Sequence, residues 1–175
     1  MNVLVVVDMQ KDFIDGALGT GEAVAIVPGV VEKIRGFEGP VIATRDTHGA
    51  DYLETEEGRH LPVVHCVKDT PGWQLHPDVE EAVLAKAGSR IIDKPTFGSV
   101  DLGGYVRELD EKEPVEKITL IGLCTDICVI SNALLLKAYL PEVPVEVDIS
   151  CCAGVTPATH DQAAEAMKMC QIGIV

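Results

Sequence analysis

The stretch Lys117-Ile-Thr-Leu-Ile-Gly-Leu-Cys-Thr-Asp-Ile-Cys-Val-Ile-Ser-Asn-Ala-Leu-Leu-Leu-Lys-Ala-Tyr139 decides the fold. A short apolar run at 118–121 is followed by Gly122 and by a helical pattern that begins near Thr125 or Asp126, so a strand, a sharp turn and a helix are predicted. Cys128 lies in the first turn of this helix, where free backbone N–H groups and the helix dipole lower the pKa of a thiol. We therefore expect Cys128 to be the nucleophile of a hydrolase, with the same N–H groups available to an oxyanion.

Apolar runs and helical patterns alternate on both sides of this stretch. Further strands are predicted at residues 2–7, 40–44, 90–94, 144–150 and 171–175, with helices between most of them. Crossovers of this length favour a right-handed parallel arrangement. We predict an α/β fold in which residues 1–175 form one three-layer α/β/α domain with a mostly parallel sheet of five or six strands. Residues 45–77 show no sustained period, and such long loops are usually functional.

The composition argues against several classes of partner. A net charge of -14 without basic runs argues against binding to nucleic acid or to an anionic membrane. No apolar run approaches the roughly 18 to 20 residues that cross a bilayer, and no charged leader precedes the first strand, so we expect a cytoplasmic protein. Its six cysteines are expected to be reduced thiols rather than a disulfide framework.

Three chemically useful side chains are predicted at the carboxyl ends of the strands. They are Asp8, Lys94 and Cys128, and ligands of open parallel sheets bind at this edge. Each has an ordinary structural alternative, because Asp8 could cap a turn, Lys94 could be a solvated charge and Cys128 a small buried hydrophobe. A base, a cation and a thiol at one edge together favour catalysis.

Four motifs give the chain a resemblance to a known family. They are Val7-Asp-Met-Gln-Lys-Asp-Phe13, Thr44-Arg-Asp-Thr-His48, Lys94-Pro-Thr-Phe97 and Gly122-Leu-Cys-Thr-Asp-Ile-Cys-Val129. In this order they resemble the isochorismatase-like cysteine hydrolases and, among these, the nicotinamidases. The resemblance implies a catalytic triad of Asp8, Lys94 and Cys128, and a homo-oligomer. It also implies a cis peptide bond between Leu123 and Cys124, with the N–H groups of Cys124 and Cys128 forming the oxyanion hole.

The irregular segment at 45–77 carries a candidate metal site. Asp46, His48 and His65 offer one carboxylate and two imidazoles, a set that suits a catalytic metal with open positions. The resemblance implies that these three residues bind a divalent metal, for which zinc is expected and iron or manganese are alternatives. Some nicotinamidases add a Glu from this loop as a fourth ligand, and others add a His. We select Glu57 over Glu54 and His60.

The resemblance also implies a reaction, the deamidation of nicotinamide to nicotinate and ammonia through a thioester. Asp8 would act as the proton carrier, while Lys94 would keep Asp8 ionised and stabilise the thiolate of Cys128. Phe13 and Phe97 are expected beside the pyridine ring of this small amide substrate.

The pocket departs from the family pattern in two places. The segment after Lys94 contains few Tyr and Phe residues. Many nicotinamidases have Trp-Pro-Pro-His where this chain has Pro62-Val-Val-His65, so an aromatic wall is missing. Two alternatives therefore stay open. One is a related cysteine hydrolase for another small amide or a carbamoyl compound, and the other is a non-catalytic binding or thiol-redox protein on the same fold.

Overall fold

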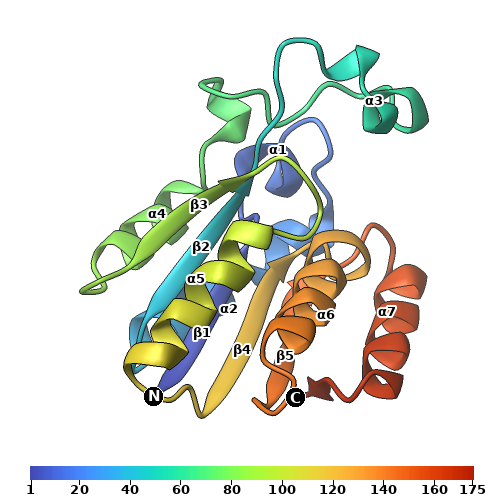
Figure 1. Ribbon diagram of the computed structural model, residues 1–175. Helices are drawn as coiled ribbons and strands as arrows, with labels where there is room; N and C mark the ends of the chain where they lie inside the picture. The colour runs from blue at the N-terminus through green and yellow to red at the C-terminus, as the bar shows by residue number, and fades with distance from the viewer.

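The computed structural model describes residues 1–175 and contains one six-stranded sheet in the order β3-β2-β1-β4-β5-β6 (Figure 1). The strands are β1 (Asn2–Val7), β2 (Val41–Asp46), β3 (Arg90–Lys94), β4 (Lys117–Leu123), β5 (Val145–Ala153) and β6 (Gly173–Ile174). Every neighbouring pair is parallel. The predicted α/β class is confirmed, and the sheet has the larger of the two expected strand numbers.

Helices cover both faces of the sheet, and each face has its own apolar core. The helices are α1 (Lys11–Ile14), α2 (Gly21–Gly36), α3 (Glu56–His60), α4 (Pro77–Leu84), α5 (Val100–Lys112), α6 (Ile130–Tyr139) and α7 (Pro157–Met169). Leu4 and Val6 of β1 belong to the core formed with α1, α2 and α4, whereas Val3 and Val5 belong to the core formed with α5, α6 and α7. This alternation is what a central strand buried on both faces requires. None of the helices combines the length and the apolar character needed to cross a membrane.

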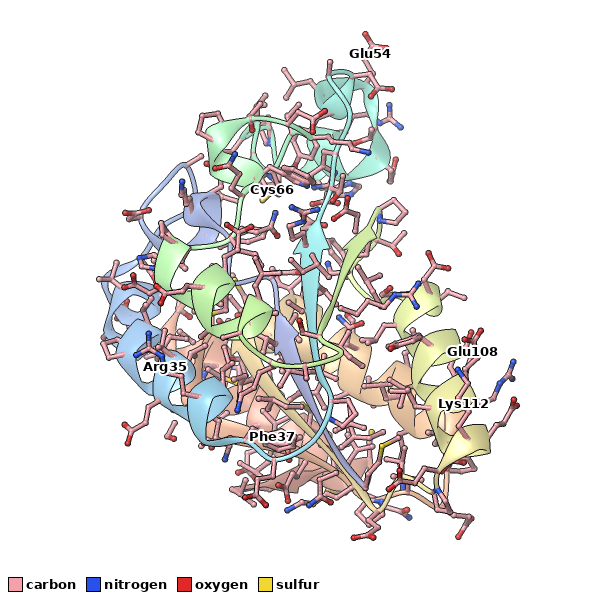
Figure 2. All side chains as sticks on the ribbon, turned by 90° about the vertical axis from the view of Figure 1, so that its left-hand side faces the viewer. Arg35, Phe37, Glu54, Cys66, Glu108 and Lys112 are labelled. Atoms are coloured by element: carbon pink, nitrogen blue, oxygen red, sulfur yellow. The ribbon has the colours of Figure 1, made fainter.

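Residues 47–76 form a layer beyond the carboxyl ends of β1, β2 and β3. The segment contains α3 and two short 3₁₀ helices, η1 (Tyr52–Glu54) and η2 (Pro71–Trp73). Within the segment, the N–H of His48 donates to the carbonyl of Cys66 and the N–H of Lys68 donates to the carbonyl of His48, both over 2.9 Å. The N–H of Thr47 donates to the carbonyl of Lys94, the last residue of β3, over 2.9 Å and joins the segment to the sheet. Figure 2 shows Glu54 at the outer tip of the segment and Cys66 nearer the sheet. The segment therefore overhangs the edge at which parallel sheets bind ligands.

The turn after β4 is tight because β1 lies against it. Gly122 has a φ of +115°, and a Cβ atom at this position would collide with the carbonyl oxygen of Val7. A glycine is therefore required at this position. The peptide bond between Leu123 and Cys124 is cis, as the resemblance implied. The predicted helix then begins as a π-helical turn, η3 (Thr125–Val129), and continues as α6.

Candidate active site

The carboxyl ends of the strands bring Asp8, Lys94 and Cys128 together. Asp8 follows β1, Lys94 ends β3 and Cys128 lies in η3. The Lys94 Nζ atom is 2.7 Å from Asp8 Oδ2 and 3.4 Å from Cys128 Sγ. All three residues are buried, so bulk water screens these charges little.

The two oxygens of the Asp8 carboxylate have different surroundings. Asp8 has a φ of +46°, and its N–H donates to the hydroxyl of Thr44 over 3.3 Å. The same hydroxyl donates to Asp8 Oδ1 over 2.7 Å. Asp8 Oδ2 is buried and accepts no hydrogen bond from another side chain or from the backbone, apart from its ion pair with the Lys94 ammonium. That oxygen is therefore in a position to accept a proton.

The resting charge of Cys128 differs from the sequence prediction. Burial raises the pKa of the Cys128 thiol well above 9.0, the Asp8 carboxylate raises it further, and the charge of Lys94 only partly offsets this. The prediction that the start of the helix gives a low thiol pKa was wrong, although Lys94 lowers this pKa as expected. Loss of hydration around the sulfur outweighs both favourable charges. The thiol is therefore protonated at rest and needs a base.

Asp8 and Lys94 form a buried ion pair, and burial affects the pKa of both residues. Burial raises the pKa of Asp8 above 3.8, and Lys94 opposes this effect. For Lys94 burial would lower the pKa, but the charges of Asp8 and Asp46 outweigh it and raise that pKa above 10.5. The lysine therefore remains a cation, as expected, and favours the ionised form of Asp8.

The turn that carries Cys128 is hydrogen-bonded around the carbonyl of Cys124. This carbonyl accepts hydrogen bonds from the N–H groups of Ile127 and Val129, at 3.1 and 3.0 Å. Burial raises the pKa of the Cys124 thiol to about 12, so this second sulfur is a poor nucleophile. Cys124 and Cys128 both line the same cavity.

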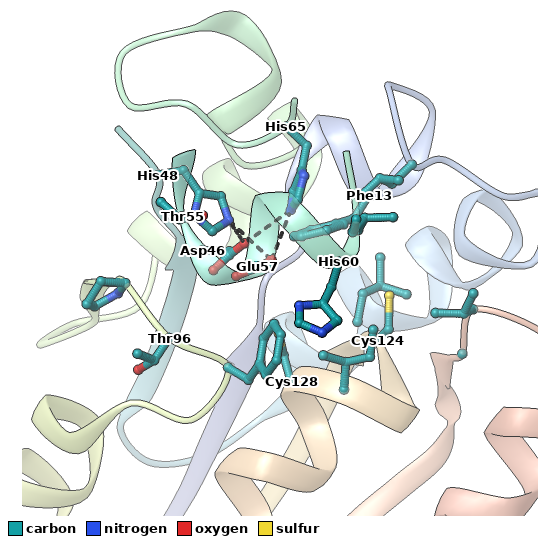
Figure 3. A pocket seen from close by; sticks show the side chains of 18 of the residues that line it. Phe13, Asp46, His48, Thr55, Glu57, His60, His65, Thr96, Cys124 and Cys128 are labelled. Atoms are coloured by element: carbon teal, nitrogen blue, oxygen red, sulfur yellow. Dashed lines mark hydrogen bonds and ion pairs between the residues drawn. The ribbon is translucent and has the colours of Figure 1, made fainter. Parts of the chain in front are cut away.

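Asp46, His48, Glu57 and His65 converge on one point beside this site (Figure 3). Their candidate ligand atoms all lie within 4.8 Å of one another. His48 Nε2 is 2.8 Å from Asp46 Oδ2, and His65 Nε2 is 3.6 Å from the same oxygen. Glu57 Oε1 lies 3.6 Å from His48 Nε2 and 3.7 Å from His65 Nε2. Of the three candidates for a fourth ligand, the structure brings only Glu57 into the cluster.

The donor set fits a divalent cation. His65 Nδ1 lies 2.7 Å from the carbonyl of Val63, which places the proton on Nδ1 and leaves the lone pair of Nε2 directed at the cluster. Burial opposes ionisation of Asp46, but the hydrogen bond with His48 and the positive charge of Lys94 help to hold the pKa of Asp46 below 3.8. Burial raises the pKa of Glu57 above 4.5, and the nearby carboxylate of Asp46 raises it further. Two imidazoles and two carboxylates suit zinc, iron or manganese.

One cavity of about 780 Å³ connects the buried thiol with the four-residue cluster. Phe13 and Phe97, the two aromatic residues selected from the sequence, both line it. Phe13 is buried and packs on the ring of His65 with 5.4 Å between centroids. Phe97 is 44% exposed and stands at the rim. The two rings therefore have different surroundings, one an inner wall and the other an edge.

Two residues between Asp8 and Phe13 support the cluster and were missed in the sequence. Gln10 is buried, and its Oε1 accepts from the N–H of Asp46 over 2.7 Å, while its Nε2 donates to the carbonyl of Asp46 over 2.8 Å. Asp12 Oδ2 accepts from the N–H of Cys66, next to His65, over 2.7 Å. The motif Val7-Asp-Met-Gln-Lys-Asp-Phe13 contained the signal, but polar residues after a strand are also ordinary turn residues.

Comparison with known proteins agrees with this geometry. Residues 2–174 match the isochorismatase domain family. The nicotinamidase/pyrazinamidase of Mycobacterium tuberculosis is 28% identical over 187 residues, covering 100% of this chain and 98% of the relative. The nicotinamidase of Schizosaccharomyces pombe is 24% identical, covering 98% and 91%. The crystal structure of the pyrazinamidase of Pyrococcus horikoshii in complex with zinc is 30% identical, covers 99% of this chain and 98% of its own, and has a TM-score of 0.83. The chain therefore belongs to the isochorismatase family.

Proposed function

We propose that this protein is a cysteine-dependent amidohydrolase that converts nicotinamide and water to nicotinate and ammonia. The observation that carries the proposal is the position of the Lys94 ammonium, in contact with both the carboxylate of Asp8 and the thiol of Cys128. The thiol opens into the same cavity as a four-residue metal-type cluster. The names of the relatives support the choice of nicotinamide, because they are nicotinamidases and pyrazinamidases.

The proposed reaction uses Asp8 as the proton carrier. Asp8 Oδ2 takes the proton of the Cys128 thiol as the sulfur attacks the amide carbon, and the N–H groups of Cys124 and Cys128 hold the oxyanion. Asp8 then gives the proton to the departing ammonia, which leaves a thioester. Water attacks the thioester as Asp8 accepts one of its protons, and the acid and the free thiol are formed.

Lys94 makes the first proton transfer less costly. Before transfer the negative charge lies on Asp8, 2.7 Å from the ammonium, and after transfer it lies on the sulfur, 3.4 Å from the same ammonium. The negative charge therefore moves without leaving its counter-ion. In a buried site this preorganisation matters more than in water, where solvent would have to rearrange.

The cluster of Asp46, His48, Glu57 and His65 would hold a divalent metal, which we propose to be zinc, with iron or manganese as alternatives. When bound, the metal supplies a Lewis acid that orients the pyridine nitrogen of the substrate. Phe13 and Phe97 would flank the ring. The zinc in the structure of the archaeal pyrazinamidase supports this assignment.

We also propose that the protein acts in the cytoplasm and forms a homo-oligomer. All six cysteines are free thiols, which supports a reducing compartment. The resemblance to a family that commonly forms dimers or larger assemblies supports the homo-oligomer.

Release of ammonia from nicotinamide tests the function. We expect the metal-loaded protein to release ammonia, a chelator to lower the rate, and Cys128→Ala to lower kcat by about a thousandfold or more. Cys170→Ala is the matched control, because Cys170 is an exposed free thiol outside the cavity. Full activity in Cys128→Ala, or no ammonia release by the metal-loaded wild type, would contradict the proposal.

A further inference from the structure

The cavity is larger than nicotinamide requires. Its volume of about 780 Å³ lies in the upper half of the range of about 300–1,000 Å³ that is typical of pockets for drug-sized ligands. Nicotinamide is a single ring with one amide group. A ring placed between Cys128 and the four-residue cluster would fill only the inner part of this space, so the outer part is available to a larger molecule.

Three partly exposed apolar residues line the outer wall of the cavity, together with the exposed polar residues Glu56 and His60. Leu61 follows α3, Phe97 follows β3 and Val155 follows β5, so three separate segments contribute to it. These residues are 37%, 44% and 52% exposed, respectively. A single exposed apolar side chain is common on any protein, but three around one cavity form a surface that a ligand can cover.

The charges around the cavity restrict what that ligand can be. No lysine or arginine side chain lines it, and the nearest buried cation, Lys94, is engaged with Asp8. A divalent metal would offset the carboxylates of Asp46 and Glu57 but would leave the outer wall with the carboxylate of Glu56 and without a lysine or arginine. The net charge of -14 adds a repulsive field for anions. A carboxylated or phosphorylated substituent would therefore lose its hydration without gaining a partner.

We infer that the enzyme hydrolyses neutral aromatic carboxamides that carry an apolar ring substituent, which packs against Leu61, Phe97 and Val155. This inference rests on the proposed function, because the amide carbon and the ring nitrogen keep the positions assigned to those of nicotinamide. The reaction is unchanged, with water consumed and the carboxylic acid and ammonia released. The apolar substituent gains burial that nicotinamide lacks.

The test compares kcat/KM for nicotinamide, for its 4-, 5- and 6-propyl derivatives and for the corresponding carboxy derivatives, with the full-length metal-loaded protein. We expect the best propyl isomer to match or exceed nicotinamide, and the carboxy compound with the same ring position to be at least about tenfold poorer. If nicotinamide is hydrolysed and every propyl isomer is poorer, the inference is overturned and the proposed function stands. If no amide in the panel is hydrolysed, both fail.

A pair of variants locates the effect. Val155→Ser should lower the ratio of kcat/KM for the best propyl isomer to that for nicotinamide by about three- to tenfold, because the propyl group loses an apolar contact. Val24→Ser is the matched control, since Val24 is 49% exposed and lies outside the cavity. This control should leave the ratio unchanged. Equal ratios in Val155→Ser and the wild type would overturn the assignment of the outer wall.

Discussion

Lys94 connects the two halves of the site. Its ammonium contacts Asp8 at 2.7 Å, Cys128 at 3.4 Å and Asp46 Oδ1 at 3.4 Å, and it donates to the carbonyl of Thr96 over 3.1 Å. The other oxygen of Asp46 faces the two histidines of the cluster. Asp46 is thus shared between the proposed metal site and the triad. A displacement of Asp46 would therefore change the surroundings of the Cys128 thiol through the side chain of Lys94.

Gln10 should control the affinity for metal without being a ligand. Its amide fixes the N–H and the carbonyl of Asp46 from a fully buried position, so its loss frees the backbone that carries a ligand. We expect Gln10→Met, which keeps the volume, to weaken zinc binding about tenfold or more, as other supporting shells do. Competition between the metal-free protein and a chromogenic zinc chelator measures this affinity.

Gln74 provides the control for Gln10. Its side chain is exposed and contacts only Lys11, at 3.4 Å, so Gln74→Met should bind zinc as the wild type does. An unchanged affinity in Gln10→Met, with native circular dichroism, would show that Asp46 needs no such support.

At the level of single residues, the sequence predicted where the site residues lie better than it predicted the burial and the contacts of their side chains. Asp8 and Lys94 could be placed because each ends an apolar run, and such ends meet at one edge of a parallel sheet. The raised pKa of Cys128 could not be predicted, since it depends on burial by residues far away in the chain. Gln10 was missed for the same reason, because its partners Asp46 and Trp73 are 36 and 63 residues away.

At the level of elements, the helices and strands that could be predicted are those whose apolar residues recur with a regular period. The strands and the long helices were found because each buries a continuous stripe or run. Pro28 lies inside α2, where a proline removes one backbone hydrogen bond of the helix. The buried stripe of α2 includes Val27 and Val30 on either side of Pro28, and this packing offsets one lost hydrogen bond. The helices within 47–76 span only three to five residues, too few for a period to show.

The ion pair between Lys33 and Asp148 should stabilise the packing of α2 on β5. Lys33 Nζ lies 2.8 Å from Asp148 Oδ2, and hydrogen bonding to Lys33 lowers the pKa of Asp148 below 3.8 despite partial burial, which raises it. Because the Lys33 side chain is 36% exposed, solvent screening limits the coupling to about 0.5–1 kcal/mol at pH 7. A double-mutant cycle with Lys33→Met and Asp148→Asn, followed by urea unfolding, measures it.

The coupling between Lys33 and Asp148 should weaken at low pH. A carboxyl group with a lowered folded pKa stabilises the protein above its unfolded value, here 3.8, and loses that contribution as the pH falls through the folded pKa. The coupling should therefore be full at pH 7 and decrease below pH 3.8. The more exposed pair Lys168–Glu165, at 2.6 Å within α7, serves as the control and should show a smaller coupling. A coupling for Lys33 and Asp148 that is no larger than this control would contradict the prediction.

At the level of the whole molecule, the proposed metal would fasten the overhanging segment to the sheet. Asp46 ends β2, whereas Glu57 lies on α3 and His65 follows it, so one ion would join the sheet edge to the outer layer. Without the ion, Asp46 and Glu57 are two carboxylates close together, and each raises the energy of the other's charge. The segment should therefore be the part of the fold that depends most on metal.

Metal removal should lower both global stability and the local stability of residues 47–76. A ligand that binds only the folded state adds about 4 kcal/mol at a concentration a thousand times its Kd. We expect zinc to raise the free energy of unfolding by about this amount, and to slow tryptic cleavage after Arg59, which is exposed on α3. Glu57→Gln should lose most of both effects, while Glu54→Gln, at the tip and outside the cluster, should retain them. Equal zinc stabilisation in these two variants would remove Glu57 from the ligand set, and no stabilisation of the wild type would argue against a metal at this site.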